Sequence, residues 1–208
     1  MLSCKVNLIY RKGYAMFAKI RQWDIAALSK IIGVRKNWLN RLMIFVTTIG
    51  NHGIVWFMLA IPMLFFYELR RTGMSIIMAM AVAFLSGEMI IKHLVKRNRP
   101  CKSVEKEKML IRIPIDYSFP SGHSTSSFAV FTVILLTMPQ ICIPVFILAS
   151  MIAFSRMYLQ VHYPSDVACG IIIGMICGYV SVKYLNYALP LLNELVQYYY
   201  PDCVLFQI

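Results

Sequence analysis

The sequence predicts an all-α fold, a polytopic membrane helix bundle of five to six transmembrane helices with an amphipathic helix at the N-terminus. Of the 208 residues, 59% are apolar and only 14% are charged, and the mean hydropathy is +0.66. A soluble domain of this size could not cover so much apolar surface. The apolar residues are also gathered into five runs with short polar joints between them.

Each run approaches the roughly 20 apolar residues that a helix needs to span a bilayer. The runs cover residues 42–67, 74–91, 124–138, 143–158 and 167–188. Gly50–Gly53 interrupts the first, so its spanning part is expected to begin near Ile54. In the fifth, Gly170, Gly174 and Gly178 fall on one helix face, where we expect another helix to approach closely.

The two ends of the chain have an interfacial character. Residues 14–33 alternate apolar and charged positions, which is typical of a basic amphipathic helix lying in the membrane interface, with a sixth, unusually polar crossing as the alternative. Tyr198–Tyr200 are aromatic residues of the kind found at membrane boundaries. With no linker between halves, we predict one domain over 1–208: a basic segment (1–41), a transmembrane catalytic core (42–188) and an interfacial tail (189–208).

Positive charge is concentrated beside the apolar runs. The net charge is +12; nine of the 21 Lys and Arg residues lie in the first 41 positions and eight more between Lys92 and Arg112. Such clusters indicate contact with anionic lipid headgroups or with a phosphate substrate. Nucleic acid would also demand Lys and Arg, but we expect no nucleic-acid partner because the spans place the scaffold in lipid.

Three segments collect polar residues at the ends of the runs, where charges are costly and therefore suggest a functional site. The first follows the second run. Lys92 and Arg99 are seven residues apart and would share one helix face if the helix continued to Pro100, which would form a clamp for a dianion. The simpler alternative is a set of ordinary positive charges flanking a span.

The second segment, residues 118–124, precedes the third run. Small residues before a helix can present backbone N–H groups to a phosphate. Here Ser121 and Gly122 take that place, Gly122 because it lets the backbone approach the ligand closely. His123 can donate a proton to a leaving oxygen. Taken alone, the segment also fits a capped helix start.

The third segment, residues 155–166, joins the fourth and fifth runs. His162 is followed four residues later by Asp166, a carboxylate that can hydrogen-bond one ring nitrogen and leave the other free to attack phosphorus. Arg156 supplies a planar, permanently charged fork that suits phosphate oxygens. The alternative is an interface loop in which His162 and Asp166 merely pair.

Together the three segments resemble the signatures of the type 2 phosphatidic acid phosphatases, in order and in internal spacing. The signatures are Lys-x6-Arg-Pro, Pro-Ser-Gly-His and Ser-Arg-x5-His-x3-Asp, found here as Lys92, Arg99, Pro100; Pro120, Ser121, Gly122, His123; and Ser155, Arg156, His162, Asp166. The resemblance implies a helical bundle with its site at one membrane face. It also implies hydrolysis of a lipid phosphate or lipid diphosphate through a phosphohistidine.

By this resemblance His162 is the nucleophile, Asp166 orients it, and His123 is the general acid. The groups that would hold the phosphoryl oxygens are Lys92, Arg99, Arg156, Ser121 and the backbone of Gly122. We expect no cofactor and no metal, because fixed cations stabilise the phosphoryl charge and the two histidines lie among cations with only one nearby carboxylate. Vanadium haloperoxidases share the site pattern but are soluble, and five spans argue against them.

The motifs contact only phosphate, so undecaprenyl diphosphate, phosphatidylglycerophosphate and phosphatidate all fit. Phosphotransfer from a lipid diphosphate to another acceptor would share the phosphohistidine step, whereas a non-catalytic lipid-phosphate binder would have no use for His162. We expect a bacterial plasma-membrane protein with its site on the outer face. The basic N-terminus favours a cytoplasmic start, and five spans would then place the site on the cytoplasmic side as well. An outer site requires either that residues 14–33 make a sixth crossing or that the basic segment lies outside. No oligomeric state is predicted.

Overall fold

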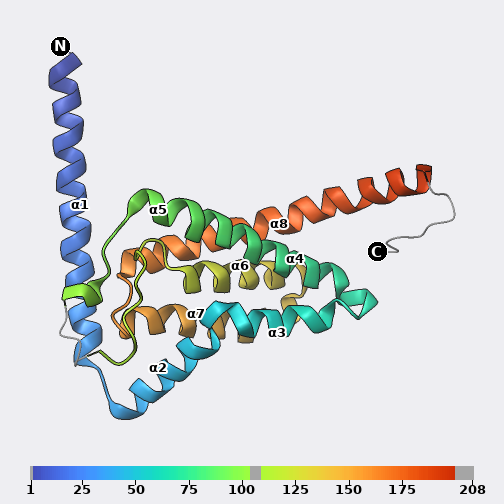
Figure 1. The fold of residues 1–208 in the computed structure, drawn as a ribbon, viewed down its shortest axis with the longest axis horizontal. Coiled ribbons are helices and arrows are strands. Elements are labelled where there is room, and N and C mark those ends of the chain that lie inside the picture. Colours follow the sequence, from blue (N-terminus) through green and yellow to red (C-terminus); the bar gives the residue numbers. More distant parts are fainter. Residues whose placement is uncertain (1, 104–108, 200–208) are drawn as a thin grey trace.

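The computed structural model describes residues 2–103 and 109–199, which contain helices and loops and no strand. Long helices lie side by side in one bundle, and α1 stands apart at one end of it (Figure 1). The helices are α1 (Leu2–Gly33), α2 (Asn37–Ile49), η1 (Asn51–Gly53), α3 (Ile54–Met63), α4 (Tyr67–Ala83), η2 (Phe84–Ile91), α5 (Lys92–Val95), η3 (Pro100–Ser103), α6 (Gly122–Thr137), η5 (Pro139–Ile141), α7 (Cys142–Tyr158) and α8 (Pro164–Tyr199).

The core of the bundle forms around α6, which packs against α8, α7 and α4. Ile76 of α4, Val130 of α6 and Ile152 of α7 are buried in this core. The outside of the bundle is also apolar, with exposed side chains that include Met58 and Ile147. An apolar exterior around an apolar core is the arrangement of a helix bundle surrounded by lipid.

Three helical stretches are long and apolar enough to cross a membrane: Tyr67–Val95, Pro139–Tyr158 and Pro164–Leu191. A fourth is the pair Asn37–Ile49 and Asn51–Met63 if it counts as one span, although it is bent by 48°. α6 is apolar but shorter, at 16 residues. The described residues therefore form a helical membrane bundle with three to four spans by length and composition, and the predicted count of five to six stays a prediction.

The bend in the first run falls at the predicted interruption. His52 and Gly53 have positive φ angles of 53° and 69°, in the left-handed region where glycine is tolerated and a side chain is strained. The chain thus turns between α2 and α3, and α2 begins at Asn37, five residues before the predicted run. Gly53 is buried at this turn, whereas His52 is exposed.

The glycine face of α8 packs against α6, as predicted. A Cβ atom on Gly170 would lie 2.8 Å from the carbonyl oxygen of Ser121. On Gly174 and Gly178 it would clash with the carbonyls of Thr125 and Ala129. The two helices are therefore in backbone contact, and this contact brings their N-terminal ends together.

The long helix that begins at α4 does not continue to Pro100. It changes to a π-helix over η2, a geometry with i→i+5 hydrogen bonds that often occurs at functional sites. It then ends with α5 at Val95, because Lys96 adopts a left-handed φ of 49°. The predicted shared helix face of Lys92 and Arg99 is therefore wrong: Arg99 lies in the loop that follows.

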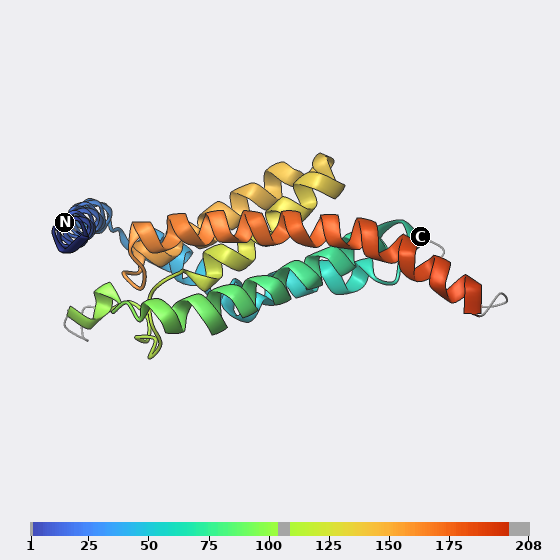
Figure 2. The ribbon, with the colours of Figure 1, turned by 90° about the horizontal axis from the view of Figure 1, so that it is seen from above.

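α1 runs across the end of the bundle rather than along it (Figures 1 and 2). Its side chains divide into buried and exposed positions, with Asp24 and Leu28 buried and Trp23 and Ile25 exposed. If the bundle axis follows the membrane normal, α1 lies along the surface; its place in the interface stays a prediction. At the other terminus α8 extends past residue 188 to Tyr199, and the rest of the predicted tail lies outside the described residues.

Candidate active site

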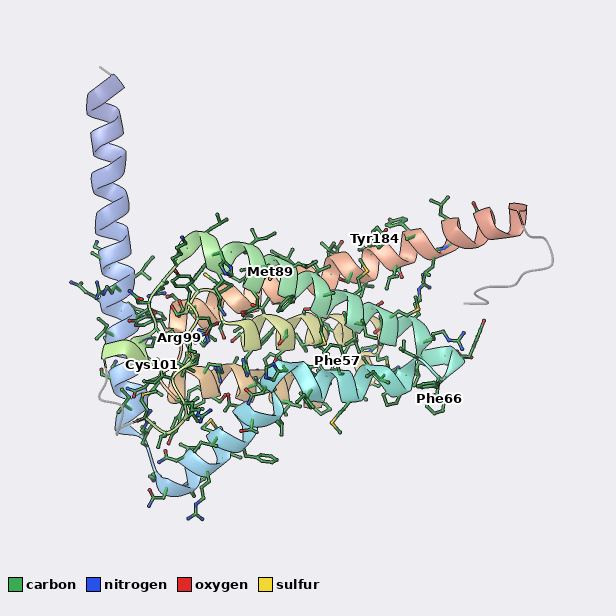
Figure 3. The ribbon with its side chains drawn as sticks, in the orientation of Figure 1. Phe57, Phe66, Met89, Arg99, Cys101 and Tyr184 are labelled. Carbon is green, nitrogen blue, oxygen red and sulfur yellow. The ribbon has the colours of Figure 1, made fainter. Side chains whose placement is uncertain are left out.

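A cavity of about 670 Å³ lies inside the bundle, near the end that carries α1. Figure 3 places Arg99 at this end and Phe66 at the opposite end. Most of the predicted site residues line the cavity: Lys92, Arg99, Gly122, His123, Arg156 and His162. Ser121 and Asp166 are fully buried and lie outside its lining.

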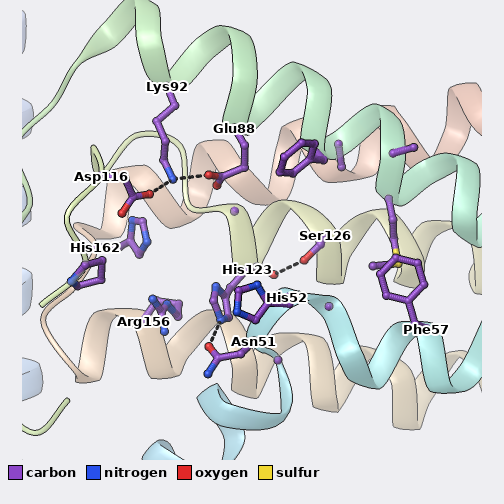
Figure 4. Close-up of a pocket in the computed structure, with 18 of the residues that line it drawn as sticks. Asn51, His52, Phe57, Glu88, Lys92, Asp116, His123, Ser126, Arg156 and His162 are labelled. Atoms are coloured by element: carbon purple, nitrogen blue, oxygen red, sulfur yellow. Dashed lines mark hydrogen bonds and ion pairs between the residues drawn. The ribbon is translucent and has the colours of Figure 1, made fainter. Parts of the chain in front are cut away.

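The turn after α7 fixes His162 relative to Arg156. Gln160 has a left-handed φ of 59°, and the chain folds back so that the backbone N–H groups of Val161 and His162 donate to the carbonyl of Arg156, at 3.1 and 3.2 Å. The side chain of His162 is 2% exposed. The spacing in the third motif thus places a cation and an imidazole at one side of the cavity (Figure 4).

The partners of the His162 ring define its tautomer. Nδ1 lies 2.6 Å from the carbonyl oxygen of Ser118, and Nε2 lies 2.9 Å from Nη1 of Arg99. A carbonyl can only accept a hydrogen bond and a guanidinium can only donate one. The proton therefore resides on Nδ1, and Nε2 carries the free electron pair that a nucleophile needs.

Asp166 does not hold His162 in the way that the sequence predicts. Its Oδ2 is 3.8 Å from Nδ1, too far for a hydrogen bond. The carboxylate instead accepts hydrogen bonds from Nη1 of Arg97 at 2.6 Å and from the backbone N–H of Tyr163 at 2.9 Å. The backbone carbonyl of Ser118 takes the place that the sequence assigned to the carboxylate.

Two carboxylates that the motifs do not contain lie among the cations. Lys92 Nζ is 2.7 Å from Oε2 of Glu88 and 2.5 Å from Oδ2 of Asp116. Arg99 Nη2 is 2.8 Å from Oδ1 of Asp116. The expectation of a single nearby carboxylate is therefore wrong. Residues 2–103 and 109–199 nevertheless contain no group of three or more His, Cys, Asp or Glu side chains placed to hold a metal ion.

Arg156 has a donor available. Its side chain is 5% exposed and donates from Nη1 to the hydroxyl of Thr47. Its Nε is buried and, among the residues described, has no hydrogen-bond partner. A buried guanidinium N–H without a partner is costly and rare, and Arg156 is one of the residues that line the cavity.

The α2–α3 turn supplies residues that no motif identified. Nε2 of His123 lies 3.0 Å from the side-chain oxygen of Asn51, and both Asn51 and His52 line the cavity beside it (Figure 4). The signal in the sequence was the interruption of the first apolar run by polar residues. It predicted a break in the helix but gave no indication that the break would contact His123.

The electrostatic environment of His162 keeps the ring neutral. Burial lowers the pKa of His162, and the positive charges of Arg99, Arg156 and Lys92 lower it further, well below its ordinary value of 6.5. At neutral pH the ring is uncharged. Asp116 behaves in the opposite way to a carboxyl that is simply buried: burial alone would raise its pKa, but the hydrogen bonds and charges of Lys92 and Arg99 outweigh this and lower it.

The sequence matches a known family. Residues 72–190, which include all three motifs, match the family model of the PAP2 superfamily. The chain belongs to the PAP2 superfamily. An undecaprenyl-diphosphatase of Sulfolobus acidocaldarius is 32% identical over 146 residues, 70% of each chain. A decaprenylphosphoryl-5-phosphoribose phosphatase of Mycobacterium tuberculosis is 35% identical over 133 residues, covering 62% of this chain and 71% of the relative.

Solved structures agree with the PAP2 assignment. The crystal structure of Aquifex aeolicus LpxE superposes with a TM-score of 0.67 at 28% identity, covering 77% of this chain and 94% of that one. A PAP2-type phosphatidylglycerolphosphate phosphatase of Bacillus subtilis has the same fold, with a TM-score of 0.66 at 22% identity over 80% and 86% of the two chains. The protein is a PAP2 membrane phosphatase that hydrolyses lipid phosphates, as the motifs predicted.

Proposed function

We propose that this PAP2 enzyme removes the terminal phosphate of a polyprenyl diphosphate such as undecaprenyl diphosphate, through a phosphohistidine and without a metal ion. The observation that carries the proposal is the composition of the cavity. One part holds the cations and the two histidines of the motifs, and another is apolar, lined by Phe57, Ile77, Met80 and Phe84. A ligand with an anionic head and a hydrocarbon chain matches both parts.

In the first step Nε2 of His162 attacks the terminal phosphorus, and the bond from that phosphorus to the bridging oxygen breaks. His123 gives its proton to the leaving lipid phosphate. Lys92, Arg99 and Arg156 stabilise the negative charge of the phosphoryl oxygens, together with the N–H of Gly122 at the start of α6. Ser121 is buried outside the cavity lining and supports that helix start, since its hydroxyl accepts from the N–H of Ser124. The neutral tautomer of His162 supports this step, because Nε2 needs no prior loss of a proton.

In the second step water attacks the phosphohistidine, and the N–P bond breaks. The now neutral His123 takes a proton from the water, so that phosphate leaves and both histidines return to their starting states. The relatives support a polyprenyl substrate, since two of them are named for undecaprenyl diphosphate and decaprenylphosphoryl-5-phosphoribose. Phosphatidylglycerophosphate and phosphatidate remain the competing substrates.

The test is phosphate release by the purified protein in detergent with EDTA, from undecaprenyl diphosphate, phosphatidylglycerophosphate and phosphatidate. We expect release from the diphosphate, inhibition by vanadate and a loss of at least about 10³-fold in His162→Ala. A loss of activity in EDTA that magnesium restores would contradict the metal-independent mechanism. Release only when an acceptor alcohol is added would indicate a phosphotransferase, and binding without release would indicate a lipid-phosphate binder.

We further propose that the enzyme lies in a bacterial plasma membrane with the cavity at the outer face. The relatives include an undecaprenyl-diphosphatase of Bacillus subtilis. Arg70 and Arg71, near the start of α4, provide positive charge at the end away from the cavity. α1 and the described residues 92–99 carry basic side chains at the cavity end and oppose this orientation. Labelling from outside the cell measures the sidedness directly.

A further inference from the structure

Asp24 is a buried carboxylate on α1, outside the residues 72–190 that match the PAP2 family model. Its side chain is 0% exposed. A charged carboxylate is almost never fully buried unless it is paired. The three groups that pair with Asp24 come from Arg97, in the loop after α5, and from Ser165, at the start of α8.

Arg97 bridges two carboxylates. Its Nη2 lies 2.6 Å from Oδ2 of Asp24, and its Nη1 lies 2.6 Å from Oδ1 of Asp166. The guanidinium carbon also lies 4.1 Å from the centre of the Tyr163 ring, which restricts its plane. The rigid fork of an arginine can donate to two carboxylates from two different nitrogens, so Asp24 and Asp166 together fix its position.

The start of α8 is held by the same carboxylate. Oδ1 of Asp24 accepts a hydrogen bond from the backbone N–H of Ser165 at 2.9 Å, and Oδ2 accepts from its hydroxyl at 2.6 Å. A carboxylate at the N-terminus of a helix pairs with the exposed N–H groups and with the positive end of the helix dipole. Asp24 therefore stabilises the turn 163–166, directly after His162.

Arg97 is connected to both groups near Nδ1 of His162, the carbonyl of Ser118 and the carboxylate of Asp166. Its side chain holds Asp166, and its backbone carbonyl accepts from the N–H of Ser118 at 2.9 Å. The carbonyl of Ser118 in turn accepts from Nδ1 of His162 at 2.6 Å. A shift of Arg97 would therefore move the carbonyl that selects the tautomer of His162 as well as the carboxylate behind it.

We propose that Asp24 is a positioning residue for the nucleophile, acting from α1 through Arg97 on Ser118, Asp166 and His162. The inference rests on the proposed role of His162. It makes the N-terminal helix part of the catalytic apparatus rather than a membrane attachment alone. If Asp24 only docks α1, its loss would lower stability without a specific effect on turnover.

The experiment is a double-mutant cycle on the full-length protein in detergent, with undecaprenyl diphosphate as substrate. Asp24→Asn, Asp166→Asn and the double variant are compared for kcat, KM and thermal midpoint. Glu68→Gln is the matched control: it also converts a carboxylate to an amide, and Glu68 is exposed at the start of α4, at the opposite end of the bundle. We expect its kcat to equal that of the wild type.

We expect Asp24→Asn to lower kcat by at least about tenfold while KM changes less than about threefold. In the Asp166→Asn background the same substitution should lower kcat by less than about threefold, because Asp24 and Asp166 hold Arg97 together and the loss of Asp166 has already released that guanidinium. Equal losses in both backgrounds, or a kcat within about twofold of wild type for Asp24→Asn, would overturn the inference.

Arg97→Lys keeps the proposal testable if Asp24→Asn does not fold. It retains the positive charge but has a single nitrogen in place of the rigid fork, and we expect the same loss of kcat and the same dependence on Asp166. Wild-type activity in Arg97→Lys would overturn the inference. An inactive wild type would refute the proposed function and the inference with it, whereas an active wild type with an unaffected Asp24 variant refutes the inference alone.

Discussion

Nη1 of Arg99 lies 2.9 Å from Nε2 of His162, so that a cation proposed to bind phosphate occupies the side of the ring proposed to attack it. The same guanidinium donates from Nη2 to Asp116 and from Nη1 to the carbonyl of Val161. The oxygens of an incoming phosphoryl group must therefore replace these partners as acceptors for Arg99. The Arg99 donors proposed to receive the substrate are already satisfied within the protein.

The acid limb of the activity should report the neutral state of His162. The nucleophile must be unprotonated, and its pKa lies well below 6.5, so activity should persist as the pH falls through 6.5 and decline only at lower pH. The measurement is kcat/KM against pH, corrected for a separate titration of the substrate. Arg99→Gln removes a positive charge that lowers this pKa and should shift the limb to higher pH. A corrected wild-type limb at or above pH 6.5 would contradict the neutral nucleophile.

Asp116→Asn should strengthen the binding of phosphate analogues. The pKa of Asp116 is lowered by Lys92 and Arg99, so the carboxylate is charged at neutral pH and competes for both cations. Without that charge we expect vanadate to inhibit about three- to tenfold more tightly, because a half-exposed ion pair of this kind is worth about 1 kcal/mol. Glu68→Gln is the control, and weaker inhibition would show that Asp116 instead orients the cations for the substrate.

The role of His123 can be tested with leaving groups of different acidity. A general acid matters for an alkoxide leaving group, such as that of phosphatidate, and hardly at all for p-nitrophenolate, which departs without a proton. His123→Ala should therefore lose about 10²–10⁴-fold on phosphatidate and much less on p-nitrophenyl phosphate. Because Asn51 contacts His123 at 3.0 Å, Asn51→Ala should show the same pattern in a weaker form. Equal losses on both substrates would assign His123 to phosphate binding.

The contact between α6 and α8 should tolerate no side chain. A methyl group on Gly174 would clash with the backbone carbonyl of Thr125, so we expect Gly174→Ala to lower the free energy of unfolding by about 1–3 kcal/mol. Gly33→Ala is the matched control, since nothing lies within 4 Å of its Cβ position. Thermal denaturation in detergent measures both; equal midpoints would show that the helices separate freely.

The membrane face of the cavity can be found by labelling. Ile115 lies in the loop beside Asp116 and is 98% exposed, so Ile115→Cys should react with a thiol reagent that cannot cross membranes. We expect labelling in intact cells, above the background of the wild type. Labelling only after the membrane is permeabilised would place the cavity at the cytoplasmic face.

Part of this site could be predicted from the sequence, because residues a few positions apart in one turn or helix stay close together in the folded chain. Arg156 and His162 meet across a single turn, and the three glycines of α8 fall on one face by helical geometry alone. Lys92 and Arg99 also converge, although for a different reason from the one predicted. The left-handed Lys96 ends the helix, and it is the loop rather than a shared helix face that brings Arg99 to Asp116.

The remaining residues could not be predicted, since their partners are distant in sequence. Asp24 meets Ser165 across 141 positions and Asn51 meets His123 across 72. In the sequence Glu88 is an ordinary acidic residue one turn before Lys92, and Asp116 is a loop residue. No local pattern indicates that both carboxylates contact the ammonium group of Lys92. The partner of His162 Nδ1 could not be predicted because it is the backbone carbonyl of Ser118, and every residue type has a backbone carbonyl.

The π-helical segment η2 determines which way Lys92 points. A π-helical turn contains one residue more than the α-helical turn it replaces, and each residue of an α-helix turns the chain by about 100°. If the residues Phe84–Ile91 formed an α-helix instead, each would turn the chain further, and Lys92 would rotate around the axis, out of the cavity. The wider π turn thus absorbs one residue and leaves Lys92 in about the direction that an α-helix one residue shorter would give. Loss of the π geometry, rather than loss of a residue, is the change that would misdirect the lysine.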